Sequence, residues 1–299
     1  MRVIVAGSSG FIGSALVQSL RESGDTVVRL VRPGAELGPD AVRWNPATGD
    51  LDEAALQRSG GFDAMVNLAG AGVADRRWSA ERRELILTSR LDTTRALANV
   101  RAAVGGVQRV LNASAVGVYG QRADEVLDET SSPGSDFLAS VCQQWESAAL
   151  TLGGEGTTVS LIRTGLVLDR SGGLLARVRP LFRAGVGGRL GSGRQWMSLI
   201  TLRDQVRALR FLLSHSVEGP VNLVAPEACT NAEFTRLLGR HLHRPTLARV
   251  PEAVLRLTLG SQMADETVLA SQRVRPLVLL DAGFTFEAPD AASVISATA

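Results

Sequence analysis

The chain contains no lysine, because all 32 of its lysine-plus-arginine residues are arginines. This absence excludes mechanisms that depend on a lysine amine, such as Schiff-base chemistry or phosphate binding by a Walker-type lysine. The arginines are nearly balanced by 30 acidic residues, so the formal net charge is only +2. Because the two signs are interspersed, as at Arg203 and Asp204, no basic patch indicates a nucleic-acid partner.

Cysteine and histidine are also scarce. Cys142 and Cys229 are far apart in the sequence and form no CxxC motif, which excludes a disulfide-rich secreted scaffold. Of the three histidines, His241 and His243 point to opposite faces of a strand, or lie about 200° apart on a helix. We therefore expect no metal site.

Long apolar runs are missing as well. No segment approaches the roughly 18 consecutive apolar residues of a transmembrane helix, so no membrane partner is expected. The first residues run directly into an apolar segment and lack the charged leader and cleavage site of a signal peptide. With 45% hydrophobic and 21% charged residues, the composition is that of a globular protein, and we expect a cytoplasmic location.

The first half of the chain alternates short apolar segments with amphipathic ones. A continuous apolar run such as residues 3–6 is typical of a parallel strand that is buried on both faces. Alternation of such strands with helices predicts right-handed crossovers and a Rossmann-type, doubly wound parallel sheet of the α/β class. Strands are predicted at residues 3–6, 27–31, 64–69, 107–113 and 159–162, and helices at 11–23, 79–104 and 137–152.

The composition changes near residue 170, where a glycine-rich region begins that extends to about residue 193. Further on, Thr230 and Glu233 match a helix-capping box, which predicts a helix over 231–241. Other helices are predicted at 203–214, 251–259 and 264–271, and a late strand at 220–224. We expect a Rossmann domain over 1–170, completed by about 200–225, and a smaller, mainly helical substrate-side subdomain over 171–199 and 226–299.

Three glycines, Gly7, Gly10 and Gly13, stand between the first predicted strand and the first predicted helix. In a dinucleotide-binding loop with this spacing, Gly7 permits a tight turn, Gly10 lets the backbone approach a diphosphate, and Gly13 allows the helix to pack closely on the strand. The helix N-terminus supplies N–H donors and the positive end of its dipole. The alternative is a glycine-rich turn that binds no ligand.

The end of the second predicted strand distinguishes the two nicotinamide dinucleotides. A site selective for NAD usually places an acidic residue there, which accepts a hydrogen bond from the ribose 2′-hydroxyl. The segment from Leu30 to Gly34 has no acidic residue, and Arg32 stands where a guanidinium can pair with a 2′-phosphate. The sequence therefore favours NADP over NAD as the cofactor, with a surface role for Arg32 as the alternative.

The glycine loop, Asn67–Gly70 and Ser114–Gly120 together resemble the extended short-chain dehydrogenases/reductases, the NAD(P)-dependent epimerases and dehydratases. The chain is most similar to an atypical group of these, known as epimerase family proteins, with a C-terminal domain of unknown function. The resemblance covers essentially the whole chain. It is also carried by Arg77–Trp78, Ser89–Leu91, Ser132–Pro133, Asp136–Ala139, Trp145–Glu146, Arg163–Gly165, Gly191–Gly193 and Thr230–Phe234.

The resemblance implies an NADP site built from the glycine loop and several more distant segments. Arg90 would reach a phosphate from a neighbouring helix, with a helix-surface salt bridge as its alternative role. Extended relatives often pair through helices, so the resemblance also implies a homodimer. The implied cofactor-binding residues are Gly7, Ser9, Gly10, Phe11, Ile12, Gly13, Arg32, Leu68, Ala69, Arg90 and Val167.

Standard members of the group transfer protons through a Tyr-x-x-x-Lys pair, in which the lysine lowers the pKa of the tyrosine and holds the ribose. This pair is absent, because the family pattern puts Cys142 at the tyrosine position and Glu146 at the lysine position. A carboxylate there would raise the pKa of a neighbouring acid, the opposite of what a lysine does. Cys142 is then either a weak acid or a small buried helix residue.

Ser114 and Tyr119 are left as the candidate catalytic residues. Tyr119 is the only tyrosine of the chain and follows a strand end, where its hydroxyl could relay a proton. The family pattern places a serine or threonine four residues before this tyrosine, but Ala115 occupies that position and Ser114 stands one residue further back. Ser114 is therefore either a hydrogen-bond donor to the substrate or a structural serine.

Two functions are compatible with these residues. The first is an NADP-dependent oxidoreductase or epimerase that acts on a small polar substrate, such as a nucleotide sugar, with a rearranged set of acid–base groups. Arg189 and Arg194 would then help to bind an anionic substrate. The second is a protein that still binds the dinucleotide but has lost catalysis, and acts as a redox sensor or scaffold. The two differ in whether a proton donor faces the nicotinamide ring.

Overall fold

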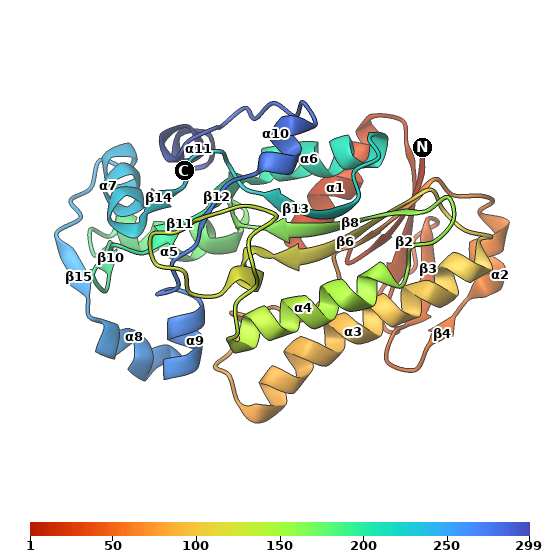
Figure 1. Cartoon of the computed structure of the whole chain (residues 1–299), viewed down its shortest axis with the longest axis horizontal. Helices are drawn as coiled ribbons and strands as arrows, with labels where there is room; N and C mark the ends of the chain where they lie inside the picture. Colours follow the sequence, from red (N-terminus) through yellow and green to blue (C-terminus); the bar gives the residue numbers. More distant parts are fainter.

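The computed structural model describes residues 1–299 and contains one large sheet with helices on both faces (Figure 1). The sheet has eight strands in the order β13-β8-β6-β5-β1-β2-β3-β4, all parallel to their neighbours except β4. The predicted Rossmann-type α/β fold is confirmed. The strands are β1 (Arg2–Ala6), β2 (Thr26–Val31), β3 (Ala41–Asn45), β4 (Asp50–Leu51), β5 (Ala64–Asn67), β6 (Arg109–Ala115), β8 (Thr158–Thr164) and β13 (Gly219–Leu223).

The direction of strand addition reverses between β1 and β5. From β1 the chain adds β2, β3 and β4 toward one edge, whereas β5, β6, β8 and β13 follow toward the other. Open parallel sheets bind their ligands at the carboxyl ends of the strands on either side of such a switch point. The topology therefore places the glycine loop, which follows β1, beside the segment that follows β5.

Two helical layers enclose the sheet because successive side chains of each strand point to opposite faces. In β1, Val3 and Val5 pack with α1 and α6, whereas Ile4 and Ala6 pack on the opposite side against α3. This explains why the strand reads as an uninterrupted apolar run. One layer contains α1 (Phe11–Glu22), α6 (Leu202–Ser214) and α10 (Leu277–Asp281), and the other α2 (Glu53–Arg58), α3 (Ala80–Ala103) and α4 (Phe137–Leu150).

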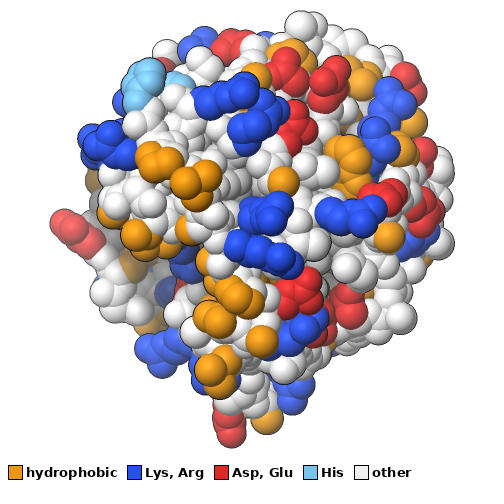
Figure 2. All heavy atoms as spheres, turned by 90° about the vertical axis from the view of Figure 1, so that its left-hand side faces the viewer, with side chains coloured by type: hydrophobic (Ala, Val, Ile, Leu, Met, Phe, Trp, Pro, Cys, Tyr) orange, Lys and Arg blue, Asp and Glu red, His pale blue; other side chains and the backbone are white.

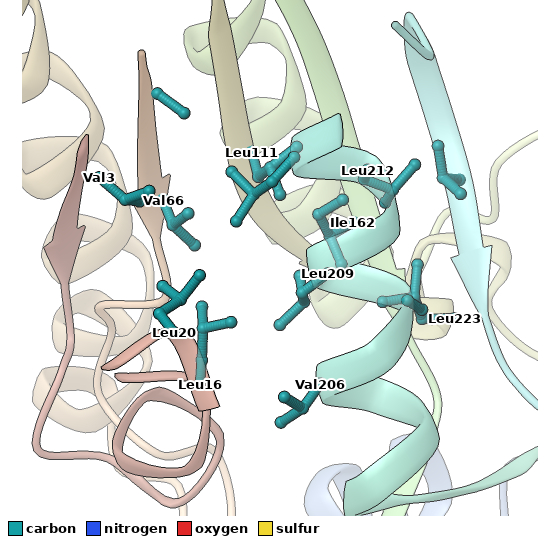
Figure 3. Packing of buried hydrophobic residues seen from close by; sticks show 14 of the residues in the cluster. Val3, Leu16, Leu20, Val66, Leu111, Ile162, Val206, Leu209, Leu212 and Leu223 are labelled. Carbon is teal, nitrogen blue, oxygen red and sulfur yellow. The ribbon is translucent and has the colours of Figure 1, made fainter. Parts of the chain in front are cut away.

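The core between the sheet and the first layer is shown in Figure 3. Leu16 and Leu20, one helical turn apart on α1, point toward Val3 and Val66 of the central strands. Val206, Leu209 and Leu212 line the matching face of α6. Full burial of a side chain of this size contributes roughly 1.5–3 kcal/mol, so this layer fixes α1, and with it the glycine loop, on the sheet.

The predicted helix boundaries agree with the structure to within about two residues where the sequence carries a cap. Ser79 accepts a hydrogen bond from Arg82 N at the start of α3, as Thr230 does from Glu233 N at the start of α7 (Asn231–His241). At the other end of α1, Gly24 has a φ of +80°, the conformation for which glycine is preferred.

The second half of the chain builds a separate apolar cluster around α5, α7 and α11, with a short strand pair beneath them. These elements and the smaller ones near them lie at the left of Figure 1, together with α8 and α9. They are β9 (Leu166–Asp169), α5 (Gly173–Arg183), β10 (Gly188–Leu190), β11 (Trp196–Met197), β12 (Leu199–Thr201), β14 (Cys229–Thr230), β15 (Ala248–Val250), α8 (Glu252–Leu259), α9 (Ser261–Glu266) and α11 (Ala291–Thr298). Arginine and acidic side chains are interspersed over this end of the molecule (Figure 2).

In this half one helix was not predicted from the sequence and another was misplaced. The glycine-rich region contains α5, which buries Leu175 and Phe182 although its surroundings are rich in glycine. The helix expected over 264–271 is α9, which spans Ser261–Glu266. The chain leaves the helix before Ser271, because the Ser271 amide donates to Gln121 Oε1 and its hydroxyl to the Ala123 carbonyl, both 2.5 Å away.

No helix of the chain has both the length and the apolar character needed to cross a membrane. Three short elements complete the structure: η1 (Val116–Tyr119), a 3₁₀ turn that follows β6, and the paired strands β7 (Val126–Leu127) and β16 (Arg273–Val274).

Candidate cofactor and active site

The glycine loop between β1 and α1 needs glycine at two of its positions. Gly7 has a φ of +79°, and a Cβ there would lie 2.6 Å from the carbonyl carbon of Leu68. A Cβ at Gly13 would lie 2.1 Å from the Gly7 carbonyl oxygen. Both distances are far shorter than a van der Waals contact. A side chain at Gly7 would push the loop away from the segment after β5, and one at Gly13 would push α1 away from the loop.

The start of α1 has the properties of an anion site. The N-cap is Gly10, which has no side chain to satisfy the N–H groups of the first turn, and this turn contains no acidic residue. Ser9 and Gly10 are exposed. The unsatisfied N–H groups and the positive end of the helix dipole are therefore open to a negatively charged group.

The segment that follows β5 lies directly against the glycine loop. Leu68 N donates to the Ala6 carbonyl at 2.9 Å, and Ala69 N donates to Asn67 Oδ1 at 3.2 Å. Asn67 is fully buried and donates in turn to Asn112 Oδ1 at 2.8 Å, so a hydrogen-bonded pair on β5 and β6 holds this segment. Leu68 and Ala69, which the family resemblance implies as cofactor-binding residues, thus lie beside the glycine loop.

Arg90 reaches the same region from α3. Its Nη1 donates to the carbonyls of Ala71 and Ile86 at 3.0 and 2.8 Å, and its Cζ lies 5.0 Å from the centre of the Trp145 ring. No carboxylate lies within ion-pair distance, so the alternative of a helix-surface salt bridge is wrong. Burial lowers the pKa of Arg90 from its usual range.

Phe11 and Val167 bring the second half of the chain to the glycine loop. Phe11 and Ile12 pack against a core cluster that includes Val167 of β9. The turn after β9 covers the Phe11 ring so closely that a Cβ at Gly172 would lie 2.5 Å from it. The candidate cofactor residues of the loop, the β5 segment, α3 and β9 are thus neighbours in space.

Arg32 is exposed and follows the last residue of β2, next to β1 in the sheet. No acidic side chain lies within ion-pair distance of its guanidinium, although nearby Arg21 and Arg29 both pair with Asp40. Arg32 therefore carries a free positive charge at the carboxyl edge of the sheet, one strand away from the glycine loop.

Ser114 and Glu146 are in direct contact in the interior. Ser114, at the end of β6, donates from its hydroxyl to Glu146 Oε1 on α4 at 2.6 Å. Both side chains are buried, with exposed fractions of 5% and 7%. The hydroxyl proton of Ser114 is therefore directed to a carboxylate, and the lone pairs of its oxygen are left to accept hydrogen bonds.

Arg163 of β8 completes this cluster, and sequence reasoning gave it no function. It binds Glu146 with two parallel hydrogen bonds, Nε to Oε1 and Nη2 to Oε2, both 2.9 Å long. Burial opposes the charged form, but the hydrogen bonds that Arg163 donates to Glu146, together with the negative charge of that carboxylate, outweigh this and raise the pKa of Arg163. The signal in the sequence is the single charged residue of a buried strand, directly after the apolar pair Leu161–Ile162, because a buried arginine requires a partner.

Tyr119 is fully buried at the end of η1. Its hydroxyl donates to Asn222 Oδ1 at 2.8 Å and accepts from Arg163 Nη1 at 3.0 Å. Burial raises the pKa of Tyr119 despite the neighbouring guanidinium. The tyrosine proton thus has a partner inside the protein, and a relay through it would first require that hydrogen bond to break.

Cys142 lies on α4, one helical turn before Glu146. It is a free, buried cysteine that packs with Tyr119 and Val118. Burial, and after it the charge of Glu146, raises the pKa of the Cys142 thiol to about 11. The thiol is therefore neutral at physiological pH, which supports the interpretation of Cys142 as a buried packing residue.

A polar cavity of about 620 Å³ opens between the loop after η1 and the helices α8 and α9, and neither Ser114 nor its partners Glu146 and Arg163 line it. Arg194 lines it, whereas Arg189, the other candidate for binding an anionic substrate, does not. The lining residues are Gln121, Ala123, Asp124, Asp136, Ser192, Arg194, Gln195, Glu252, Arg256, Asp265, Glu266, Leu269 and Ser271. Nowhere in the chain do three or more His, Cys, Asp or Glu side chains form a group that could hold a metal ion.

Comparison with known proteins places the chain in a family. An epimerase family protein of Mycobacterium bovis is 46% identical over 285 residues, which cover 95% of this chain and 93% of the relative. The human epimerase family protein SDR39U1 is 35% identical over 295 residues, covering 97% of both chains.

Two crystal structures support the same relationship. Human SDR39U1 with NADPH has a TM-score of 0.89 at 33% identity, covering 99% of this chain and 98% of that one. A nucleoside-diphosphate sugar epimerase of Corynebacterium glutamicum has a TM-score of 0.79 at 32% identity, and this chain spans 57% of its length. Models of the NAD dependent epimerase/dehydratase family and of DUF1731, a domain of unknown function, match residues 3–224 and 250–298. The chain therefore belongs to the NAD dependent epimerase/dehydratase family.

Proposed function

We propose that the protein binds NADP(H) at the glycine loop and is an oxidoreductase or epimerase-like enzyme that acts on a small polar substrate. The observation that carries this proposal is the uncapped start of α1 with the unpaired Arg32 one strand away. The diphosphate of a dinucleotide binds at a helix start with free N–H groups, and a 2′-phosphate pairs with an arginine such as Arg32. The crystal structure of human SDR39U1 with NADPH supports the choice of cofactor.

In this proposal the chain holds the cofactor at four places. The N–H groups from Ser9 to Gly13 bind the diphosphate, and Arg32 pairs with the 2′-phosphate. Leu68 and Ala69, directly after β5, contact the dinucleotide. The Arg90 guanidinium on α3 adds a positive charge. When bound, the cofactor supplies the hydride chemistry, and the protein orients the reacting groups.

Ser114 is the residue that we assign to substrate in this site. Its proton is held by Glu146, so its oxygen accepts a hydrogen bond from a substrate hydroxyl. Glu146 and Arg163 are then positioning residues, since their two-point ion pair fixes the carboxylate that orients Ser114. Tyr119 acts behind them through its bond to Arg163.

A second function is supported by a specific observation. The Tyr119 hydroxyl and the Cys142 thiol, which would be the usual sources of a proton, are both buried, and the Tyr119 proton is bound by Asn222. A protein that binds NADP(H) without turnover, as a redox sensor or scaffold, would have this arrangement.

One experiment separates the two functions. The protein is incubated with NADPH and with NADP⁺ and a set of small carbonyl compounds, polyols and sugars, and the nicotinamide absorbance is followed. Oxidation or reduction that is lost in Ser114→Ala supports the enzyme. Tight NADPH binding without turnover of any compound supports the sensor, and absence of NADPH binding contradicts both.

A further inference from the structure

The first turn of α5 contacts the segments on both sides of the proposed cofactor site. At its N-cap, Gly172 lies against the ring of Phe11, the first residue of α1, where a Cβ would be 2.5 Å from the ring. Further along the helix, Arg177 donates from Nη1 to the Ala74 carbonyl at 2.7 Å, in the segment that follows β5. With a rise of 1.5 Å per residue, the two contacts are only about 7 Å apart along α5.

These contacts close a ring in front of the start of α1. On the opposite side of the ring, the glycine loop touches the segment after β5, because a Cβ at Gly7 would lie 2.6 Å from the Leu68 carbonyl carbon. From Leu68 the chain continues to Ala74, which Arg177 connects back to α5 and Phe11. Open parallel sheets bind their ligands between these two loops, so a diphosphate at the start of α1 would be enclosed by the ring.

We propose that α5 is a lid over the bound dinucleotide and that Arg177 is the latch that holds the lid closed. The contacts of Arg177 belong to the closed state, and they have to break for NADP(H) to enter or leave. A closed lid excludes water from the reacting groups and slows release of the cofactor. The inference rests on the proposed function, because it takes the occupant of the ring to be the dinucleotide.

The segment after β5 is a firm support for the latch. Arg90 Nη1 donates to the Ala71 carbonyl at 3.0 Å, and the Ala71 amide donates to Ser89 Oγ at 3.0 Å. Trp78 Nε1 donates to the Val73 carbonyl at 2.8 Å. These bonds tie the segment to α3 and to the turn before it, so the lid opens by movement of α5 and not of this segment.

The latch itself is weak enough to open. Arg177 supplies both the hydrogen bond and the ion pair that join α5 to the segment, and the ion pair, with Asp75, is 3.5 Å long. The two side chains are 59% and 56% exposed, and Arg82 of α3 competes for Asp75 at 3.3 Å. Water competes for exposed groups of this kind, so the contacts stabilise the closed state only slightly.

The remainder of α5 determines how the lid moves. Leu175 and Phe182 are buried in the apolar cluster with α7 and α11, which keeps α5 attached to the second half of the chain when Arg177 lets go. Gly173 joins β9 to α5 with a φ of +65°, a conformation in which glycine is preferred, and can serve as the joint. Opening is then a small displacement of α5 that leaves its apolar face buried.

Arg177→Ala tests the latch both without and with the cofactor. In the nucleotide-free protein, hydrogen exchange followed by mass spectrometry should show faster exchange of the amides of residues 70–76 and 172–177. Stopped-flow fluorescence should show that NADPH dissociates about three- to tenfold faster, as expected for loss of an exposed hydrogen bond from a charged donor. The thermal melt should stay nearly unchanged, which distinguishes a latch from a residue that supports the fold.

Arg183→Ala is the matched control, because Arg183 is an exposed arginine of the same helix. It should leave both amide exchange and the rate of NADPH dissociation at the wild-type values. Dissociation rates that are equal in Arg177→Ala and the wild type overturn the latch, whatever the amide exchange. Equal acceleration in the two variants overturns it as well. A wild-type protein that does not bind NADPH contradicts the proposed function, and with it this inference, and the titration that shows this precedes any variant.

Discussion

Glu146, which stands where the family resemblance implies the lysine of the catalytic pair, forms a buried two-point ion pair with Arg163. Both hydrogen bonds are 2.9 Å long, and each residue is less than a tenth exposed. The carboxylate that replaces the lysine is thus neutralised from the next strand, and it orients Ser114 instead of the cofactor ribose.

The first prediction concerns this ion pair. Arg163→Met should lower the free energy of unfolding by about 3–5 kcal/mol, because it leaves the buried Glu146 carboxylate without an opposite charge. The double variant Arg163→Met, Glu146→Leu should recover part of this loss. Urea unfolding measures both. Arg256→Met, which breaks an exposed pair, is the control and should cost no more than about 1 kcal/mol. Equal losses in Arg163→Met and the control would mean that the buried pair is not formed.

The second prediction concerns the choice of cofactor. Arg32→Ala should weaken NADPH binding about 10- to 100-fold, which is the loss of a charge-assisted pair with the 2′-phosphate, and should leave NADH binding nearly unchanged. Calorimetric titration with both nucleotides checks this. Arg58→Ala removes an exposed arginine on α2 and serves as the matched control. If the wild-type protein binds NADH as tightly as NADPH, the assignment of Arg32 is wrong.

The third prediction concerns the glycine loop. Gly10→Val should abolish binding of NADPH while the protein still folds. Gly10 has a φ of −74°, and a Cβ there approaches the protein only at Gly7 O, at 3.3 Å, so the side chain would extend mainly toward the ligand. Fluorescence titration with NADPH and a thermal melt measure the two effects. Gly13→Ala is the contrasting variant, since its Cβ would collide with the loop and lower stability. A Gly10→Val protein with unchanged nucleotide affinity would remove the diphosphate from this turn.

The fourth prediction concerns alkaline pH. Burial raises the pKa of Cys142 to about 11 and that of Cys229 to about 12 from an ordinary value of 9.0. Between the ordinary thiol pKa and the raised pKa of each thiol, the folded protein binds more protons than the unfolded one. Stability should therefore fall as the pH rises above about 9. Urea unfolding at several pH values should show this fall, and Cys142→Ala should reduce its slope. An identical slope in the variant would contradict the assigned burial of the thiol.

The fifth prediction separates the roles of Ser114 and Tyr119. Tyr119→Phe leaves Asn222 Oδ1 without its donor, and Arg163 Nη1 keeps only the long bond of 3.4 Å to the Glu129 carbonyl, so the change should cost about 1–3 kcal/mol of stability. Ser114→Ala should change stability less but should lower turnover of any substrate found in the screen. Thermal melts and initial rates give both quantities. If Tyr119→Phe instead lowers the rate with no loss of stability, Tyr119 acts on the substrate directly, and its assignment as a residue behind Arg163 is wrong.

The glycine loop was predictable because its causes are local. The apolar run of β1, the glycine spacing and the start of α1 are adjacent in the sequence, and each requirement belongs to one or two residues. The position of Arg32 follows for the same reason, since it directly succeeds a recognisable strand. The helix that begins at Asn231 was predictable from the capping residue Thr230.

The missed parts depend on contacts between distant residues. The helix α5 lies among glycines, and its amphipathic face is stable only because Leu175 and Phe182 pack into a cluster with α7 and α11. Ser271 leaves its expected helix because Gln121 and Ala123, 150 and 148 residues away, bind it. No window of the sequence contains both partners of such contacts.

The same distinction divides the site. The amino-acid sequence alone determined that a Tyr–Lys pair is impossible, since no lysine exists, and it predicted which residues would bind a phosphorylated dinucleotide. The tertiary structure decided which residues stand where the Tyr–Lys pair is missing. It brings Ser114, Glu146 and Arg163 together from two strands and a helix. The physical reason is that a charge can be buried only with its partner, and the packing of the sheet against α4 determines which partner is within reach.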